Sequence, residues 1–284
     1  MFHAIDSHDP RAVCVHVRNV FGELGWADSA SLVDRLFHDV EGAFAGRHRD
    51  YQAIDMRYHS LQHTLEATYC LVEIIAGRER AGATPGLGRR DAELALMSAL
   101  LHDCGYLKHR GDSTGTGAKY TFVHEHRSCD FARQYLPALG VKPEEIEDVC
   151  AAISCTGPRH HIANHTFRLP VARLLAGILV TADYLAQMSA PDYPDKLEAL
   201  YREFEEAYEH EGLTPEQRPY RNLHQLLATS GEFWNGFVRP MLDKEAGAVY
   251  RYLAHTGQPN SYLQAVEDNL AEIARRLSAG LVKV

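Results

Sequence analysis

The stretch LALMSALLHD, residues 94–103, predicts a buried helix that ends in two chemically reactive side chains. Residues 94–101 are apolar on every side of a helix, which is typical of a helix inside a protein core. His102 and Asp103 follow directly. A carboxylate there is costly unless a positive charge compensates it, and a divalent cation bound by neutral His and ionised Asp would do so. The structural alternative is a capping Asp beside a buried, hydrogen-bonded His.

Apolar residues recur at helical spacing along most of the chain, for example at Leu32, Val33, Leu36, Phe37 and Val40. Alternating Val, Ile and Thr runs long enough for strands are missing. The sequence therefore predicts an all-α fold. Helices are expected at about 29–46, 60–78, 90–104, 121–138, 143–155, 168–189, 193–211, 221–241 and 259–280. Loops are expected at about 81–88 and 105–119, the second being rich in glycine.

The composition is that of an ordinary globular protein, with 284 residues, 45% hydrophobic and 24% charged. The net charge of −9 argues against binding to nucleic acid or anionic lipid. The longest apolar run, 169–182, is interrupted by Arg173 and is shorter than the roughly 20 residues of a membrane helix. The six cysteines form no C-x-x-C pair and the N-terminus does not look like a signal peptide, so we expect a cytoplasmic protein without membrane contact.

Histidine is unusually abundant, at 17 residues, and several histidines stand in suggestive places. His59 and His63 are four residues apart, which places both on one face of a helix. Asp183 lies in an otherwise apolar segment. Further candidates are His124, His126, His160 and His161. Each of these histidines alone is explained equally well by a structural role, but the ordered set is hard to produce by accident.

In this order the motifs resemble the HD-domain superfamily of metal-dependent phosphohydrolases, over roughly residues 55–190. That resemblance implies that His63, His102, Asp103 and Asp183 hold one metal ion. As in the dinuclear branch, Asp103 would bridge to a second ion, completed by His124 and by either His160 or His161. The resemblance implies a metal-binding helical core at 55–190, and we expect N-terminal helices at 1–54 to pack on it. After about residue 190 the histidines thin out and charged helical patterns appear, which predicts a supporting C-terminal helical extension at 191–284.

Two segments resemble more specific elements. His124-Glu125-His126-Arg127-Ser128 is similar to the family's third histidine motif, H-E-x-x-S, which favours His124 over His126. Tyr58-His59-Ser60-Leu61-Gln62-His63 resembles the Y-H-N-x-x-H element of class I cyclic-nucleotide phosphodiesterases, which implies that His59 is the general acid. Ser60 replaces the Asn of that element, Cys104 follows the His-Asp pair where those enzymes carry a further His, and no G-Y-P follows His160-His161. These departures argue against specificity for cyclic nucleotides and for cyclic di-GMP.

Weaker signals surround these motifs. Lys108 and Arg110 are close to the His-Asp pair and could clamp a phosphate, with 111–117 as a lid, although a solvated loop explains them equally well. Of the adjacent His160 and His161, the one that is not a ligand is expected to face substrate.

Together these features predict a metal-dependent phosphomono- or phosphodiesterase that acts on a nucleotide-like small molecule. Asp103 and His59 are the expected catalytic residues, and one or two divalent ions (Fe, Mn, Zn or Mg) are the expected cofactors. The alternatives are a diiron oxygenase of the same superfamily and a non-catalytic, metal-stabilised binding module. The sequence leaves the oligomeric state open, a homo-oligomer included.

Overall fold

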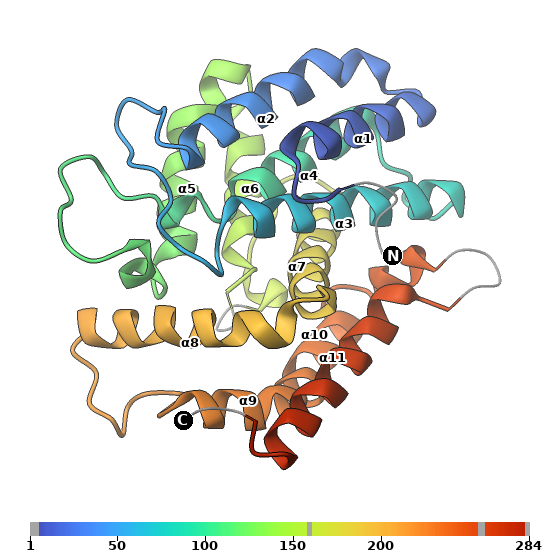
Figure 1. Cartoon of the computed structure of the whole chain (residues 1–284). Helices are drawn as coiled ribbons and strands as arrows, with labels where there is room; N and C mark the ends of the chain where they lie inside the picture. The colour runs from blue at the N-terminus through green and yellow to red at the C-terminus, as the bar shows by residue number, and fades with distance from the viewer. Residues whose placement is uncertain (1–5, 158–160, 255–258, 282–284) are drawn as a thin grey trace.

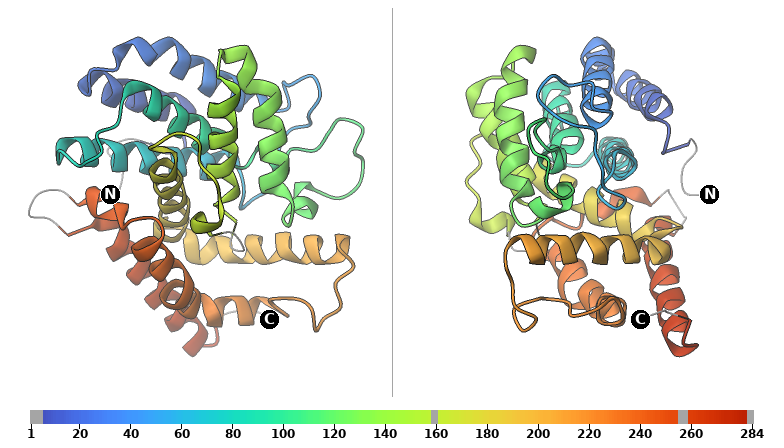
Figure 2. Two further views of the ribbon diagram at one scale, coloured as in Figure 1. Left: turned by 180° about the vertical axis from the view of Figure 1, so that it is seen from behind. Right: turned by 60° about the vertical axis from the view of Figure 1, so that its left-hand side comes forward.

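The computed structural model describes residues 6–157, 161–254 and 259–281, and over these residues it is all-α, which confirms the predicted fold class (Figures 1 and 2). The one extended pairing described is an isolated antiparallel bridge between Tyr51 and His109. The α-helices are α1 (Pro10–Glu23), α2 (Ala30–Phe44), α3 (Leu61–Arg80), α4 (Arg89–Leu101), α5 (His124–Tyr135), α6 (Pro143–Ser154), α7 (Ala172–Ser189), α8 (Tyr193–His210), α9 (Leu223–Glu232), α10 (Arg239–Lys244) and α11 (Ser261–Ser278).

Helices α3 and α7 form the centre of the molecule and pack along each other. Most side chains of both helices are buried, as are those of α4. Helices α1 and α2 cover this centre on one side, and α8, α9 and α11 lie on the opposite side (Figure 1). The motifs that carry the predicted metal ligands, at the start of α3 and at the end of α4, therefore lie between the core and the C-terminal helices. The division of the chain near residues 55 and 190 stays a prediction.

Helix α1 lies outside the ranges that the sequence predicted, although its signals are present. Asp9 caps the backbone N–H of Arg11, and Pro10 occupies the first helical position, where its missing N–H costs nothing. Val13, Val17 and Val20 then repeat at spacings of four and three and are buried. A second difference lies at 221–241, where a six-residue π-helix, Phe233–Val238, separates α9 from α10.

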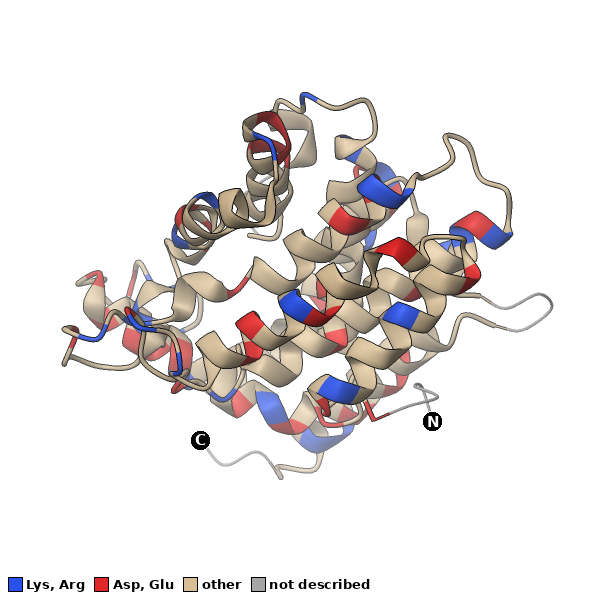
Figure 3. Ribbon diagram, turned by 90° about the horizontal axis from the view of Figure 1, so that it is seen from above, with Lys and Arg blue, Asp and Glu red and all other residues tan. Residues whose placement is uncertain are grey.

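Charged residues of both signs are interspersed along the helices in Figure 3. No helix among the described residues is both long enough and apolar enough to span a membrane. The expected absence of nucleic-acid binding stays a prediction, and the oligomeric state stays open.

The turn after α4 is held against α5 by close packing at Gly105. A Cβ atom at this position would lie 1.9 Å from the carbonyl oxygen of His124 and 2.8 Å from the backbone nitrogen of Ser128. Ser128 Oγ accepts a hydrogen bond from the Gly105 N–H at 2.8 Å and donates one to the carbonyl of His102 at 2.5 Å. The serine of the H-E-x-x-S segment thus fixes the His-Asp turn to α5.

We therefore expect Gly105→Ala to lower the free energy of unfolding by about 1–3 kcal/mol, because backbone atoms would have to move to admit the methyl group. Urea denaturation followed by circular dichroism measures the change. Gly111→Ala is the matched control, since a Cβ there meets no atom within 4 Å and should change stability little. Equal effects of the two substitutions would contradict the packing argument.

Candidate metal centre

Four side chains that the sequence predicted as metal ligands meet at the junction of α3, α4 and α7. His63 stands in the first turn of α3, His102 directly follows α4, and Asp183 lies in the middle of α7. Asp103 follows His102 in the turn. All four are buried, with at most 5% of each residue exposed. The structure therefore brings together residues up to 120 positions apart in the sequence.

The facing atoms of these side chains have the spacing of ligands around one ion. The Nε2 atoms of His63 and His102 are 3.2 Å apart. Asp103 Oδ2 lies 3.3 Å from the first nitrogen and 3.4 Å from the second. Asp183 Oδ1 lies 3.1 Å and 3.6 Å from the same two nitrogens. Neighbouring ligand atoms about 2.1 Å from a shared metal are about 3.0–3.4 Å from one another. His63, His102 and Asp103, whose ligand atoms all lie within 4.8 Å of one another, therefore fit a shared cation, and Asp183 Oδ1 lies beside both histidine nitrogens at the edge of this group.

The hydrogen-bond pattern points to the same conclusion. Asp103 Oδ2 is buried and has no hydrogen-bond partner, although two ring nitrogens lie close to it. An orphaned carboxylate oxygen is costly, and a cation would compensate it. His102 Nδ1 lies 2.7 Å from the carbonyl of Ala99, which can only accept, so Nδ1 carries the proton. Nε2, which faces the cluster, is then the nitrogen that can serve as a metal ligand when a cation displaces its proton.

The electrostatics of the cluster favour ionised carboxylates. Burial opposes the charged form of Asp103, but the surrounding imidazoles outweigh it and lower the pKa of this carboxyl. Burial also opposes the charged form of Asp183, but His102 and His63 outweigh it and lower the pKa of this carboxyl. Burial also opposes protonation of His102, yet Asp103 and Asp183 raise its pKa to about 9. The site is therefore strongly attractive to positive charge.

His124 occupies a second position beside the cluster. Its Nε2 atom lies 3.9 Å from Asp103 Oδ1, the carboxylate oxygen that does not face His63 and His102. Its Nδ1 donates to the carbonyl of Thr121 at 2.8 Å, which leaves Nε2 with the lone pair. His126, the alternative considered from the sequence, is 77% exposed at its side chain and pairs with Asp130 on the surface. The geometry therefore favours His124.

One of the paired histidines at residues 160 and 161 was expected to complete the second metal site. His160 lies outside the described residues. His161 is exposed, and its Nδ1 pairs with Glu245 at 2.7 Å. It does not line the cavity beside the metal cluster. The expected substrate contact of His161 therefore gains no support from the structure.

Lys108 and Arg110 also have partners other than substrate. The Lys108 amine is buried, pairs with Asp55 at 3.2 Å and donates to the Gly115 carbonyl. The Arg110 guanidinium donates to three backbone carbonyls of residues 46–49. Their closeness to the His-Asp pair in sequence does not bring their charges into the cavity, and the contacts argue against the predicted phosphate clamp. They also pin the loop that was expected to act as a lid.

His59 forms a buried pair with a residue that the sequence analysis did not identify. Its Nδ1 atom lies 2.7 Å from Glu203 Oε2, and Glu203 comes from α8. The other oxygen of Glu203 accepts from the backbone N–H groups of Arg57 and Tyr58. Burial opposes protonation of His59, but the Glu203 carboxylate outweighs it and raises the pKa of His59. The signal in the sequence was a single Glu on the apolar face of 193–211, beside Leu200, Phe204 and Ala207.

A second hydrogen-bond network orients Asp183 within the metal cluster. Gln187 Nε2 donates to Asp183 Oδ1 at 2.6 Å. Its carbonyl oxygen accepts from the hydroxyl of Tyr58 at 3.0 Å. Tyr58, which adjoins His59, is thereby connected to the ligand Asp183. The start of α3 and the middle of α7 are thus held in one arrangement by the side chains that border the site.

The cluster opens into a cavity of about 350 Å³ between the core and the C-terminal helices. His59, His63, Asp103, His124 and Asp183 all line it. Its remaining walls are predominantly apolar and aromatic. The cavity therefore gives a small molecule access to the metal cluster and to His59 together.

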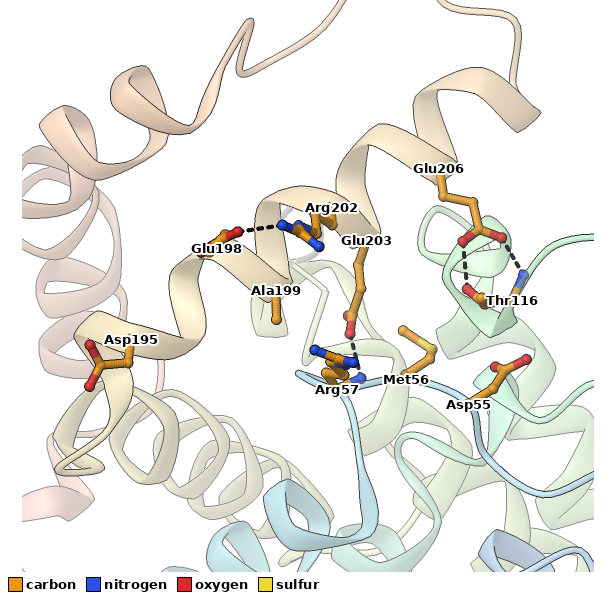
Figure 4. Close-up of a pocket in the computed structure, with 10 residues that line it drawn as sticks. All are labelled: Asp55, Met56, Arg57, Thr116, Asp195, Glu198, Ala199, Arg202, Glu203 and Glu206. Carbon is orange, nitrogen blue, oxygen red and sulfur yellow. Dashed lines mark hydrogen bonds and ion pairs between the residues drawn. The ribbon is translucent and has the colours of Figure 1, made fainter. Parts of the chain in front are cut away.

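A separate groove of about 420 Å³ lies on the other side of α8, and Figure 4 shows its acidic lining. Its carboxylates are already partnered. Glu206 accepts a hydrogen bond from the hydroxyl of Thr116, and Glu198 pairs with Arg202. Glu203 accepts from the backbone N–H of Tyr58, just before α3. This groove therefore does not form a second metal centre.

Comparison with known families places the site in a recognised domain. The family model of the HD domain matches residues 60–188. That range contains the four clustered side chains and His124, and excludes His59 by one residue. A comparison with curated protein sequences gave no match.

Proposed function

Because residues 60–188 match the HD domain, we propose that the chain is a metal-dependent phosphohydrolase of the HD-domain superfamily, a phosphomono- or phosphodiesterase acting on a small organic phosphate. The observation that carries the proposal is the close spacing of the His63, His102 and Asp103 ligand atoms, all within 4.8 Å of one another, with Asp183 Oδ1 beside both histidines and Asp103 Oδ2 lacking a hydrogen-bond partner. The predicted nucleotide-like substrate is one member of this class.

Each part of the site has a defined task in this proposal. The four clustered side chains would hold a divalent ion, which when bound supplies Lewis acidity and a water of lowered pKa. His59, kept protonated by Glu203, would donate its proton to the departing alkoxide oxygen. Tyr58 and Gln187 would hold Asp183 in its orientation. The cavity walls would exclude bulk water from the reacting phosphate.

The position of His124 supports a second ion in the same proposal. The two oxygens of Asp103 face different histidines, Oδ2 towards His63 and His102, and Oδ1 towards His124. A carboxylate divided in this way can bridge two ions, as two-metal hydrolytic centres require.

We therefore expect two metal ions per chain under saturating conditions and about one in His124→Ala. Metal analysis after gel filtration measures the count. His126→Ala is the matched control, because that ring lies on the surface, and it should keep both ions. A count of one in the unmodified protein, unchanged by His124→Ala, would establish a mononuclear centre instead.

A substrate panel tests the proposed reaction. Protein purified without air and reloaded with Mn²⁺, Fe²⁺ or Zn²⁺ is assayed against nitrophenyl phosphate, bis-nitrophenyl phosphate and alkyl phosphates. We expect metal-dependent release of phosphate or phosphomonoester. Consumption of O₂ by the reduced protein without any phosphoester turnover would replace the hydrolase by the oxygenase. Metal binding without either reaction would indicate a binding module.

A further inference from the structure

The cavity beside the metal cluster continues into an aromatic chamber formed by the C-terminal helices. We define the aromatic chamber by Tyr184 of α7, Leu200, Phe204 and Tyr208 of α8, Tyr220 of the following loop, and Phe233 of the π-helix. Phe204 stacks on Tyr208 and on Tyr220, with ring centroids 6.1 Å and 5.7 Å apart. These contacts give the chamber a continuous aromatic wall.

Tyr106, whose ring stacks on His59 and His124 beside the metal cluster, has a buried hydroxyl without a hydrogen-bond partner, and Glu125 pairs with His124 at the same end of the cavity. The amide and aliphatic hydroxyl side chains of the lining, in contrast, are already engaged within the protein. Both ends of the Gln187 amide are bonded, to Asp183 and Tyr58. The hydroxyl groups of Thr156 and Ser230 donate to carbonyls of their own helical turns. Hydrogen-bonded recognition of a base or a sugar needs polar groups directed at the ligand, and these side chains are directed elsewhere. The described lining thus favours an apolar ligand group over a nucleoside.

The charge of the lining limits the ligand further. None of the described residues that line the cavity is Lys or Arg. A ligand with several phosphates would therefore find countercharge at the metal cluster and at His59 alone. A single phosphate placed there is compensated, but additional phosphates in the aromatic chamber would be desolvated without partners.

From these observations we infer that the aromatic chamber holds the uncharged, apolar organic group of a phosphate ester with a single phosphate. The inference rests on the proposed hydrolase function for the identity of the phosphate group. At about 30 Å³ for each non-hydrogen atom, the cavity holds roughly a dozen such atoms. After the phosphate, the remaining space suits a phenyl ring or a chain of about six carbons.

The test uses full-length protein loaded with Mn²⁺ and a series of alkylphosphonates, which cannot be hydrolysed. Calorimetry should show affinity rising about fourfold for each added methylene, or about 200-fold from ethyl to hexyl. No further gain is expected from hexyl to decyl, since the chamber is then full. Turnover of the matching alkyl phosphates is measured in parallel, with AMP as the nucleotide probe.

Substitutions in the wall of the aromatic chamber test whether the chamber causes the dependence of affinity on chain length. Leu200→Gln adds a polar group to the wall and should weaken hexylphosphonate binding about tenfold while leaving ethylphosphonate unchanged. Leu139→Gln is the matched control, because Leu139 is also half-buried but does not line the cavity, and it should keep the full series. If Leu200→Gln does not fold, Phe204→Leu replaces it, with the same loss of preference for the longer chain.

The outcomes separate the two proposals. Binding that does not depend on chain length, or AMP hydrolysed more efficiently than hexyl phosphate, would overturn the aromatic chamber as an apolar site and leave the hydrolase intact. Chain-length-dependent binding with no turnover of any ester would overturn the hydrolase and leave the apolar ligand class standing.

Discussion

Asp103→Asn should lose its bound metal and reduce turnover by about 10³-fold to 10⁴-fold, the largest effect expected of any conservative change in this chain. The substitution keeps the size of the side chain but replaces a carboxylate oxygen by an NH₂ group or a neutral carbonyl. Either atom would lie about 3.3 Å from the facing nitrogens of His63 and His102, where the unmodified protein presents negative charge. The cluster then has one carboxylate, Asp183, to balance a divalent ion.

Metal content and stability give readouts that do not depend on finding the substrate. In the unmodified protein, a metal ion present at 100 times its dissociation constant should stabilise the fold by about 2.7 kcal/mol. That gain should nearly vanish in Asp103→Asn. Asp130→Asn is the control, since this exposed carboxylate on α5 pairs with surface residues and should retain both metal content and turnover. Full metal occupancy in Asp103→Asn would refute the assigned role.

The metal cluster was accessible to sequence analysis in part because its two carboxylates stand in an unfavourable local setting. Asp103 and Asp183 are carboxylates in apolar helical segments, and the cost of burying them predicts a compensating cation wherever the segments meet. His63 was identified by its family motif. The assignment of all four residues to one ion came from the resemblance to the HD-domain motifs, which stands in for knowledge of how α3, α4 and α7 pack.

Lys108 and Arg110 show where the same approach fails. They are five and seven residues after Asp103, yet the chain turns away after the short 3₁₀ helix Cys104–Tyr106, and their charges bond to carbonyls of the loops. Nearness in sequence carries no information on direction once a turn intervenes. Glu203 was missed for the complementary reason, since its partner His59 is 144 residues away and the pairing depends on how α8 docks.

The aromatic chamber also could not be predicted from the sequence. Its residues belong to α7, α8, the loop after α8 and the π-helix, and each aromatic side chain is equally consistent with ordinary core packing. The charged pattern of α8 predicted a supporting helix, and its exposed face is indeed charged. Only the packing of α8 and α9 against the core shows that its apolar face borders the metal cluster.

His59→Ala should retain both metal ions and lose turnover by about 10²-fold to 10⁴-fold with alkyl phosphates. The loss should be small with nitrophenyl phosphate, because that leaving group departs without a proton. The sequence placed His59 on the helix that carries His63, but α3 begins at Leu61 and His59 precedes it. His59 is nevertheless suited to this task, because its ring centroid lies 6.0 Å from that of His63 and the residue lines the cavity. Equal losses with both substrate types would exclude the acid role and leave a purely structural one.

Glu203→Gln tests the same role through the pH profile. A general acid works only while protonated, so activity should fall as pH rises through the pKa of His59. The Glu203 carboxylate raises that pKa, and its removal should move the alkaline limb of the profile to lower pH. The glutamine carbonyl can still accept from the N–H groups of Arg57 and Tyr58, so the start of α3 keeps its anchor. Glu205→Gln is the control, because Glu205 lies two positions further along α8 and so on a different face of the helix, and it should leave the profile unchanged. A profile of Glu203→Gln that coincides with that of the unmodified protein would show that His59 does not set the alkaline limb, because the charge beside its ring would have changed without effect.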